Sequence, residues 1–216
     1  LHDVNFDHHK CEVHALLGEN GAGKTTLMNI LYGMFAPTDG TITINGNTFA
    51  SMTPKEAIDA GIGMVHQHFM LIEPLTVTEN IILGYEEDTG LFLDRKEARQ
   101  KIKKLSDRYG LHIDPDARVE DITVGQQQRV EILKALYRGA DVLIFDEPTA
   151  VLTPQEIKEF IDIVNKLTSM EKSIIIITHK LAEIKAMADY CAIIRRGEFI
   201  DKLRLAVIDE NILAEM

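Results

Sequence analysis

The chain alternates short apolar runs with longer amphipathic segments. The apolar runs are continuous and end in polar or glycine residues, which is typical of strands buried on both faces of a parallel sheet. They are EVHALLG (12–18), GIGMVHQ (61–67), DVLIFDE (141–147), SIIIITH (173–179) and YCAIIRRG (190–197). Helical patterns separate these runs, and such strand–helix alternation predicts an α/β fold with a mostly parallel sheet and right-handed crossovers.

The segment 153–170 carries the clearest helical pattern. Thr153 precedes it, and Glu156 follows three residues later, which predicts a capping box at the N-terminus of the helix. Apolar residues recur behind this cap at helical spacing and are expected to form one buried face. These residues are Ile157, Ile161, Val164 and Leu167.

Two segments depart from the strand–helix alternation. Residues 40–51 alternate with period two around an Asn-Gly pair, which predicts a small antiparallel hairpin. Strand signals are almost absent from residue 69 to residue 138, where helical patterns dominate. We therefore expect one domain over 1–216, in which 1–68 and 139–216 form the α/β core with its antiparallel part and 69–138 form an inserted helical subdomain. The chain starts without methionine inside a strand pattern, which predicts that an N-terminal strand is missing.

Composition and charge narrow the possible functions. Hydrophobic residues make up 45% of the 216 residues, and no apolar stretch approaches the ~18 residues of a membrane span. The net charge of -11 argues against a nucleic-acid partner, which would require a basic surface. The one basic run, RKEARQKIKK (95–104), is diluted by Asp94 and Glu97 and is expected to be a solvated helix face. Cys11 and Cys191 lack metal-binding spacing, so we expect buried free thiols in a reducing cytosol.

A glycine-rich segment with a lysine follows the first predicted strand. GENGAGKT (18–25) fits the pattern G-x-x-x-x-G-K-[ST], with a strand before it and a helix after it. Glycines allow several backbone N–H groups to turn inward around an anion, and the following helix adds its positive end. A glycine-rich turn without a ligand is the alternative, and the match at every fixed position disfavours it.

This segment is expected to bind the phosphates of a nucleoside triphosphate. Lys24 would reach the β- and γ-phosphates, and the Thr25 hydroxyl would ligate Mg²⁺. The expected nucleotide-binding residues are Gly18, Glu19, Asn20, Gly21, Ala22, Gly23, Lys24, Thr25 and Thr26.

Two acidic residues end the apolar run DVLIFDE. Ligands bind beyond the carboxyl ends of parallel strands, where Asp146 and Glu147 are expected to lie. Asp146 would hold Mg²⁺, through water, and Glu147 would activate the attacking water as general base. Two acids at a strand end can also simply cap a helix. Beside a phosphate-binding loop they favour an ATPase or GTPase.

A third motif indicates a family. DITVGQQQRVEILKAL (121–136) resembles the signature sequence of the ATP-binding cassette (ABC) ATPases, and it lies between a helical segment and the Asp-Glu strand as in that family. The family's usual opening is Leu-Ser-Gly-Gly-Gln, and here the residues are Ile122, Thr123, Val124, Gly125 and Gln126. Thr123 can still cap a helix and donate to phosphate, and Gly125 keeps a close backbone approach.

Two polar residues stand where this family has its Q-loop and H-loop. Gln67 ends GIGMVHQ and would ligate Mg²⁺ or position the water, and His179 ends IIIITH and would donate to the γ-phosphate. A histidine at a strand end is otherwise more often structural. The flanking His66 and His68 suggest a metal, but without further ligands their alternation at the end of a strand explains them better.

Two further positions depart from the family pattern. Thr153 replaces an aspartate that in the family helps to couple two nucleotide sites. The aromatic residue that stacks on adenine in the family is expected to be missing. Phe6 is a candidate substitute, although its pattern is better explained by a place in the core of a strand.

The resemblance covers nearly the whole chain and extends to a subgroup. LLGENGAGKTTLMNILYGMFAPTDGTI and DEPTAVLTPQE are most similar to the first cassette of bacterial importers for simple sugars and nucleosides. The resemblance implies an ATPase that uses ATP and Mg²⁺, dimerises with a second cassette and binds transmembrane permease subunits at the cytoplasmic side of the membrane. A binding protein outside the cytoplasm would deliver the cargo. A soluble ABC-type regulator and a non-catalytic nucleotide sensor remain the alternatives.

Overall fold

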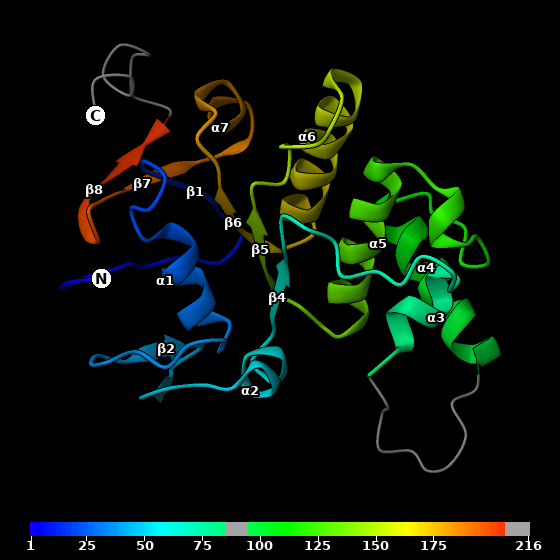
Figure 1. Cartoon of the computed structure of the whole chain (residues 1–216), viewed down its shortest axis with the longest axis horizontal. Helices are drawn as coiled ribbons and strands as arrows, with labels where there is room; N and C mark the ends of the chain where they lie inside the picture. Colours follow the sequence, from blue (N-terminus) through cyan, green and yellow to red (C-terminus); the bar gives the residue numbers. More distant parts are fainter. Residues whose placement is uncertain (85–94, 206–216) are drawn as a thin grey trace.

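A six-stranded sheet lies at the centre of the computed structural model, which describes residues 1–84 and 95–205 (Figure 1). Its strand order is β4-β5-β6-β1-β7-β8, and all neighbours pair in parallel except β7 and β8. The strands are β1 (Val13–Leu17), β4 (Ile62–Val65), β5 (Val142–Asp146), β6 (Ser173–Ile177), β7 (Tyr190–Arg195) and β8 (Glu198–Arg204). The predicted α/β fold with a mostly parallel sheet is confirmed.

Helices cover both faces of this sheet, which explains the continuous apolar runs. Successive β5 residues point to opposite faces, so that Ile144 packs on one side and Phe145 on the other. The Ile144 side holds α1 (Lys24–Leu31) and α2 (Pro54–Asp59). The Phe145 side holds α5 (Val124–Tyr137) and α6 (Pro154–Ser169), while α7 (Leu181–Met187) packs on β1 and β7.

Within the described residues 69–84 and 95–138, the named elements are helices, beside one isolated bridge between Thr76 and Arg118. α3 (Val77–Ile82), α4 (Arg95–Tyr109) and the 3₁₀ turn η1 (Val119–Asp121) lie beside α5 at one end of the molecule (Figure 1). The basic run forms most of α4, whose apolar face is buried at Ala98 and Ile102. Asp94, which we expected to dilute that run, lies outside the described residues.

The period-two segment forms the expected hairpin. β2 (Ile42–Ile44) and β3 (Asn47–Phe49) pair antiparallel as a separate two-stranded sheet. Asn45 and Gly46 both have positive φ, of 49° and 84°, which is the conformation that a tight hairpin turn requires.

The cap of α6 is confirmed, whereas its expected buried face is partly wrong. Thr153 and Glu156 form the reciprocal hydrogen bonds of a capping box, and the helix begins at Pro154. The buried residues are Phe160, Ile163, Val164 and Leu167, and Ile157 and Ile161 are only half-buried. Because α6 packs against β6 of the sheet and also against α4 and α7, its contact face is wider than one apolar stripe and is centred on Phe160.

The two cysteines differ in burial, so our expectation was wrong for one of them. Cys191 in β7 is fully buried, and this burial raises the pKa of its thiol to about 12. Cys11 is exposed, because it lies in a turn before β1 with a φ of 63°. The first residues also form a bridge between His2 and Glu198 rather than a strand, and the first strand begins at Val13.

A pair of histidine rings packs together at β1, an inner strand of the sheet. His14 in β1 is fully buried and contacts the His8 ring, with 4.4 Å between ring centroids. Nε2 of His14 lies 2.8 Å from a Glu12 carboxylate oxygen. Burial lowers the pKa of His8 to about 4 and also lowers the pKa of His14.

Acidification is therefore expected to destabilise the fold through His8. In the unfolded chain the pKa of histidine is about 6.5, so between pH 6.5 and 4 the unfolded state binds more protons than the folded state. The contribution of His8 to stability is then highest above pH 6.5, and we expect a loss of about 2–3 kcal/mol by pH 4.5 from this residue. Urea unfolding of the wild type and of His8→Phe, which keeps an aromatic ring, measures this contribution. The variant should lose part of the pH dependence, the exposed control His9→Phe should keep it, and equal slopes in all three would contradict the assignment.

Candidate nucleotide-binding site

The sheet brings the sequence motifs to one edge. β1, β4, β5 and β6 run parallel, and in their register Ile177 lies beside both Leu16 and Asp146. The residues that follow these strands therefore emerge at the same level, beyond the carboxyl ends of the strands. They are Gly18 after β1, Gln67 after β4, Glu147 after β5 and His179 after β6.

Backbone geometry of the loop 18–26 explains its glycines. Gly21 and Gly23 have positive φ of 80° and 107°, which turns the chain sharply before α1 begins at Lys24. A Cβ atom on Gly18 would lie only 2.1 Å from the carbonyl oxygen of Ile194 in β7. Only glycine thus fits where the loop leaves the sheet. The N–H of Ala22 donates to the carbonyl of Glu19 at 3.1 Å and closes the loop into a tight turn.

The Lys24 ammonium group lies inside this loop. Lys24 is only 6% exposed, and its Nζ donates to the carbonyl oxygens of Gly18 at 2.7 Å and Glu19 at 3.0 Å. Burial lowers the pKa of Lys24, while the nearby charges of Glu147 and Asp146 act to raise it. A buried ammonium group whose hydrogen-bond partners are neutral carbonyl oxygens is well placed to exchange them for an anionic ligand.

Two oxygen ligands for a small cation lie side by side next to the loop. The Thr25 hydroxyl donates to Oδ1 of Asp146 at 3.4 Å, and Asp146 is 8% exposed. Burial raises the pKa of Asp146, and the charge of Glu147 adds to this effect. Among the described residues, no group of three or more histidine, cysteine, aspartate or glutamate side chains could hold a metal ion by itself. The pair fits Mg²⁺, which commonly takes one or two protein ligands and completes its shell with water and phosphate oxygens.

Glu147 has the strained backbone of a functional residue. Its φ is 47°. Its N–H donates to the carbonyl of Ile177 at 2.9 Å, and this hydrogen bond holds the residue that follows β5 against the end of β6. Oε1 lies 2.9 Å from Nδ1 of His179. Within the described part of the chain, Oε2 is buried and has no hydrogen-bond partner. The carboxylate is thus oriented by one oxygen and keeps the other available.

The remaining predicted residues lie at different distances from this cluster. His179 lies two residues beyond the end of β6, not at the strand end as expected, and contacts Glu147. Gln67 lies in an exposed bend two residues beyond β4, not at the strand end as expected. The chain leaves the sheet at His66, so the side chain of Gln67 is not held by strand neighbours.

The signature residues cap a helix on the other side of the sheet. Thr123 accepts from the N–H of Gln126 at 3.3 Å, and the Gln126 side chain accepts from the N–H of Thr123 at 3.0 Å. α5 therefore begins at Val124, and the predicted cap is confirmed. α5 and α1 pack on opposite faces of the sheet, so a single chain keeps its signature apart from its own phosphate loop.

Sequence reasoning missed the polar contacts that hold the segment after Glu147. Thr149 is 1% exposed, its hydroxyl donates to Glu183, and its carbonyl accepts from Nζ of Lys180 at 3.1 Å. On the α5 side, Gln128 donates to the carbonyl of Pro148 at 2.7 Å. The only sequence signal was the spacing of Lys180, which precedes α7, and Glu183 in its first turn, and this spacing is too common to indicate a role.

With this geometry in view, comparison with known proteins identifies the family. The sequence model described as ABC transporter matches residues 1–150.

This chain belongs to the ABC transporter family.

Curated relatives resemble the cassette along nearly its whole length. The nucleoside import ATP-binding protein NupA of Lactococcus lactis is 58% identical over 213 residues, which are 99% of this chain and 42% of the relative. The guanosine import ATP-binding protein NupO of Bacillus subtilis is 54% identical over 214 residues, with the same coverage of 99% and 42%. The chain thus spans less than half the length of these relatives.

A solved cassette has the same fold. The dimeric structure of the ATP-binding cassette MJ0796 in a post-hydrolysis state, bound to ADP and Pi, superposes with a TM-score of 0.77. The two sequences are 25% identical, and the superposition covers 94% of this chain and 89% of the MJ0796 chain. Family membership implies that this cassette binds nucleotide.

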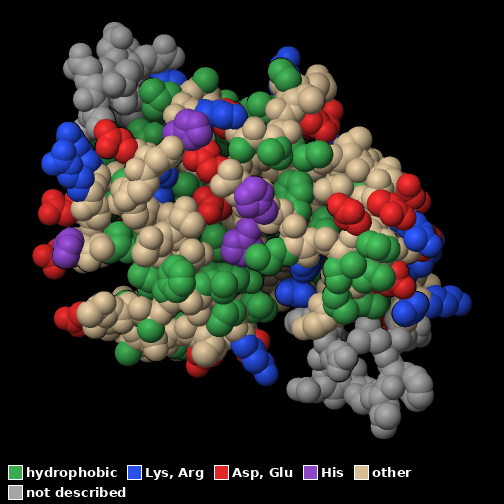
Figure 2. All heavy atoms as spheres, in the orientation of Figure 1, with side chains coloured by type: hydrophobic (Ala, Val, Ile, Leu, Met, Phe, Trp, Pro, Cys, Tyr) green, Lys and Arg blue, Asp and Glu red, His purple; other side chains and the backbone are tan. Residues whose placement is uncertain are grey.

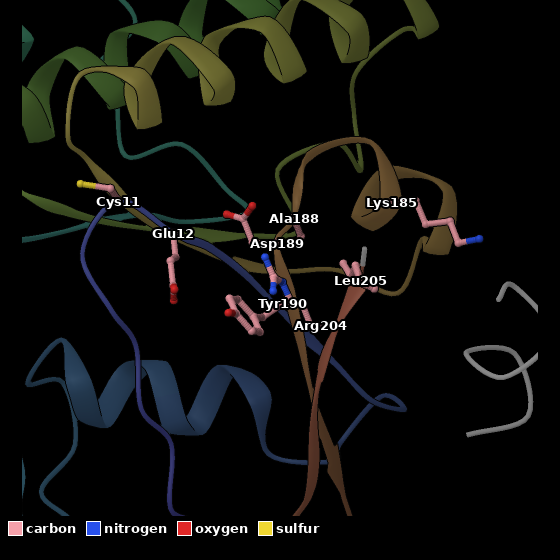
Figure 3. A pocket seen from close by; sticks show the side chains of 8 residues that line it. All are labelled: Cys11, Glu12, Lys185, Ala188, Asp189, Tyr190, Arg204 and Leu205. Carbon is pink, nitrogen blue, oxygen red and sulfur yellow. The ribbon is translucent and has the colours of Figure 1, made fainter. Parts of the chain in front are cut away.

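Phe6, the candidate for stacking on adenine, and a cleft at the other end of the sheet both make contacts within the fold. Phe6 lies before β1 and not in a strand as expected, but it is partly buried in the core, where its ring packs edge-on against His14 with 5.9 Å between ring centroids. A cleft of about 480 Å³ opens at the amino ends of β1 and β7, and Figure 3 shows its lining side chains. Asp189 in that cleft accepts from the backbone N–H of Val13 at 2.8 Å, so it holds two segments of the chain together. The cleft lies at the sheet edge opposite the phosphate loop.

Proposed function

We propose that this ABC cassette binds ATP with Mg²⁺ and hydrolyses it to power a membrane importer. The observation that carries the proposal is the convergence of Lys24, Thr25, Asp146, Glu147 and His179 at one sheet edge. A buried lysine inside a glycine loop, opposite two carboxylates, is the arrangement that phosphoryl transfer requires.

The loop and its lysine bind the phosphates in this proposal. Backbone N–H groups between Gly18 and Thr26 surround the phosphate oxygens, and Lys24 exchanges its carbonyl partners for the β- and γ-phosphates. Thr25, Asp146 and Gln67 would hold Mg²⁺, Asp146 through water. When bound, Mg²⁺ neutralises phosphate charge in the transition state.

Glu147 acts as the general base. Its unpartnered Oε2 accepts a proton from the water that attacks the γ-phosphorus, and the bond to the β,γ-bridging oxygen breaks to give ADP and phosphate. His179 holds the other carboxylate oxygen through Nδ1, which leaves its Nε2 to contact the γ-phosphate.

A second cassette completes the site. Because α5 and α1 lie on opposite faces of the sheet, the signature of a chain lies apart from the phosphate loop of the same chain. The γ-phosphate is therefore covered by the signature of the second cassette, which consists of Thr123, Val124, Gly125 and Gln126. ATP then holds two cassettes together and hydrolysis releases them. In this proposal residues 1–68 and 139–216 are the P-loop core, and 69–138 are the helical subdomain that carries the signature.

An apolar surface offers a place for the permease subunits. Met34, Phe35, Met70 and Ile72 are exposed by 50%, 53%, 65% and 45%. Figure 2 shows hydrophobic side chains gathered between the end of α1 and β4, beside a hollow. A groove of about 180 Å³ in this region is lined by residues of the core and of α5. An apolar groove on a peripheral subunit fits a helix of a membrane partner.

Peripheral attachment through the permease would place the protein at the cytoplasmic side of the membrane. Among the described residues, no helix has the length and hydrophobicity to cross a bilayer. The names of the relatives favour nucleosides or simple sugars as cargo. Cargo would be selected by the permease and by a binding protein outside the cytoplasm.

Co-purification tests this assignment. The full-length protein, affinity-purified from detergent-solubilised membranes, is expected to bring a permease pair with it and to hydrolyse ATP. Phe35→Asp should reduce the recovered permease severalfold, because a charge in an apolar contact must be desolvated. Ile200→Asp, at a comparably exposed apolar position on β8, should not. Absence of a permease would favour the soluble regulator, and absence of hydrolysis would favour the nucleotide sensor.

A further inference from the structure

One carboxylate connects the signature to the start of α6. Oε2 of Glu156 accepts from the N–H of Thr153 at 3.0 Å and from its hydroxyl at 2.8 Å. Oε1 of the same residue accepts from the N–H of Gly125 at 3.2 Å and from the Thr123 hydroxyl at 3.4 Å. Glu156 therefore lies between the N-termini of α5 and α6.

Close approach and charge both show that this contact is specific. A Cβ atom on Gly125 would lie 2.6 Å from Oε1 of Glu156, so the carboxylate reaches the helix terminus only because residue 125 is glycine. Hydrogen bonds from Thr153, and then from Gly125 and Thr123, lower the pKa of Glu156. The side chain is accordingly an anion at neutral pH, at the positive end of a helix.

The donors that Glu156 engages are those that the signature would offer to nucleotide. In the proposed composite site, the Thr123 hydroxyl and the Gly125 N–H face the γ-phosphate of the partner's ATP. A phosphate and a carboxylate cannot both approach one N–H closely without strong repulsion.

We propose that Glu156 occupies the signature donors in the separate cassette as an internal anion, and that the partner's γ-phosphate must displace it. This inference rests on the proposed function, because it assumes that the signature acts on a partner's nucleotide. Glu156 thereby sets how much ATP is needed to bring two cassettes together.

Displacement of Glu156 from the signature should cost little free energy, because its two carboxylate oxygens have different partners. Only Oε1 leaves its partners, and Oε2 keeps the Thr153 cap, so the start of α6 stays intact. α5 remains attached to α6 by the ion pair between Arg129 and Glu159. Half-burial of Glu156 also lets water replace the donors that it gives up.

Glu156→Gln tests the competition. Glutamine at this position retains a capping box, so α6 should still fold, but it is a neutral and weaker competitor for the donors. Both variants under comparison carry Glu147→Gln to suppress hydrolysis. With Mg-ATP, sedimentation equilibrium is expected to show association at least about tenfold tighter after Glu156→Gln, because a dimer relieves the repulsion at two sites.

Two controls separate this effect from a change in net charge or in nucleotide binding. Asp162→Asn removes one charge from an exposed position of α6 and should leave association unchanged. Affinity of the monomer for a fluorescent ATP analogue should also be unchanged by Glu156→Gln, because Glu156 contacts the signature and not the phosphate loop.

The outcomes distinguish this inference from the function on which it rests. If the Glu147→Gln parent associates with ATP but Glu156→Gln associates equally or more weakly, Glu156 only supports the signature and the competition is refuted. If the parent itself fails to associate with ATP, the composite site is contradicted, and the inference fails with it.

Discussion

Glu147→Gln is expected to lower steady-state ATP hydrolysis about a hundredfold or more while leaving ATP binding intact. A glutamine side chain has nearly the same shape, but it cannot accept the proton of the attacking water as a carboxylate does. Oε2 of Glu147 is buried without a partner in the described part of the chain, and the strained backbone at φ 47° holds it in place. Phosphate release by the full-length protein measures turnover, and a fluorescent ATP analogue measures binding.

Glu198→Gln is the matched control for this result. It makes the same chemical change at an exposed position on β8, far along the sheet from β5, and should not alter turnover. Hydrolysis at the wild-type rate in Glu147→Gln would remove this residue from the role of general base. Loss of binding together with hydrolysis would instead mean that the carboxylate holds the nucleotide site together.

Lys24→Ala is expected to weaken Mg-ATP binding by about tenfold to a hundredfold. A charge-assisted contact to phosphate contributes roughly 1.5–3 kcal/mol, and the buried Lys24 ammonium would supply at least one. In the structure, the ammonium group donates only to the carbonyls of Gly18 and Glu19. Water can replace it at these carbonyls once the side chain is removed, so the loop should keep its shape. Titration with the fluorescent ATP analogue gives the dissociation constant.

Lys172→Ala provides a close control, because Lys172 also donates to a backbone carbonyl, that of Ala140, at 2.8 Å. Its ammonium pairs with Asp141 at the opposite end of β5 from Asp146. This variant can lower stability but should bind ATP as the wild type does. Equal affinity in Lys24→Ala and the wild type would contradict the interpretation of the loop.

The hydrophobic pattern predicted the strands of the central sheet well, for a physical reason. Strands buried on both faces must be continuously apolar, and the first polar residues after them emerge at the carboxyl edge. Asp146 and Glu147 were expected at that edge for this reason, whereas Lys24 was indicated by the glycine-rich motif and His179 by the resemblance to the ABC family. In the structure, Lys24 lies inside the loop that follows β1, Asp146 accepts from Thr25, and Glu147 contacts His179. The small antiparallel hairpin was equally clear, because Asn45 and Gly46 have the backbone preferences of the turn.

Features that depend on contacts between distant segments could not be predicted. The buried face of α6 is centred on Phe160 because several elements pack around the helix, which a single helical stripe does not indicate. Cys11 looked buried because it adjoins an apolar run, but a positive φ turns it outward.

The same limit applies within the site. Thr149 and Glu183 are 34 residues apart in sequence, and Gly125 and Glu156 are 31 apart. No local pattern reports either contact. Glu156 was recognised only as part of a capping box, although its second oxygen reaches the signature of another helix.

A crystal structure of the Glu147→Gln protein grown with Mg²⁺ and ATP tests the central claim most directly. The account predicts that the N–H groups between Asn20 and Thr26 surround the phosphates, with Lys24 on the γ-phosphate and Thr123 and Gly125 of a second cassette on its far side. A loop without nucleotide, or with those N–H groups turned away from it, would contradict the account.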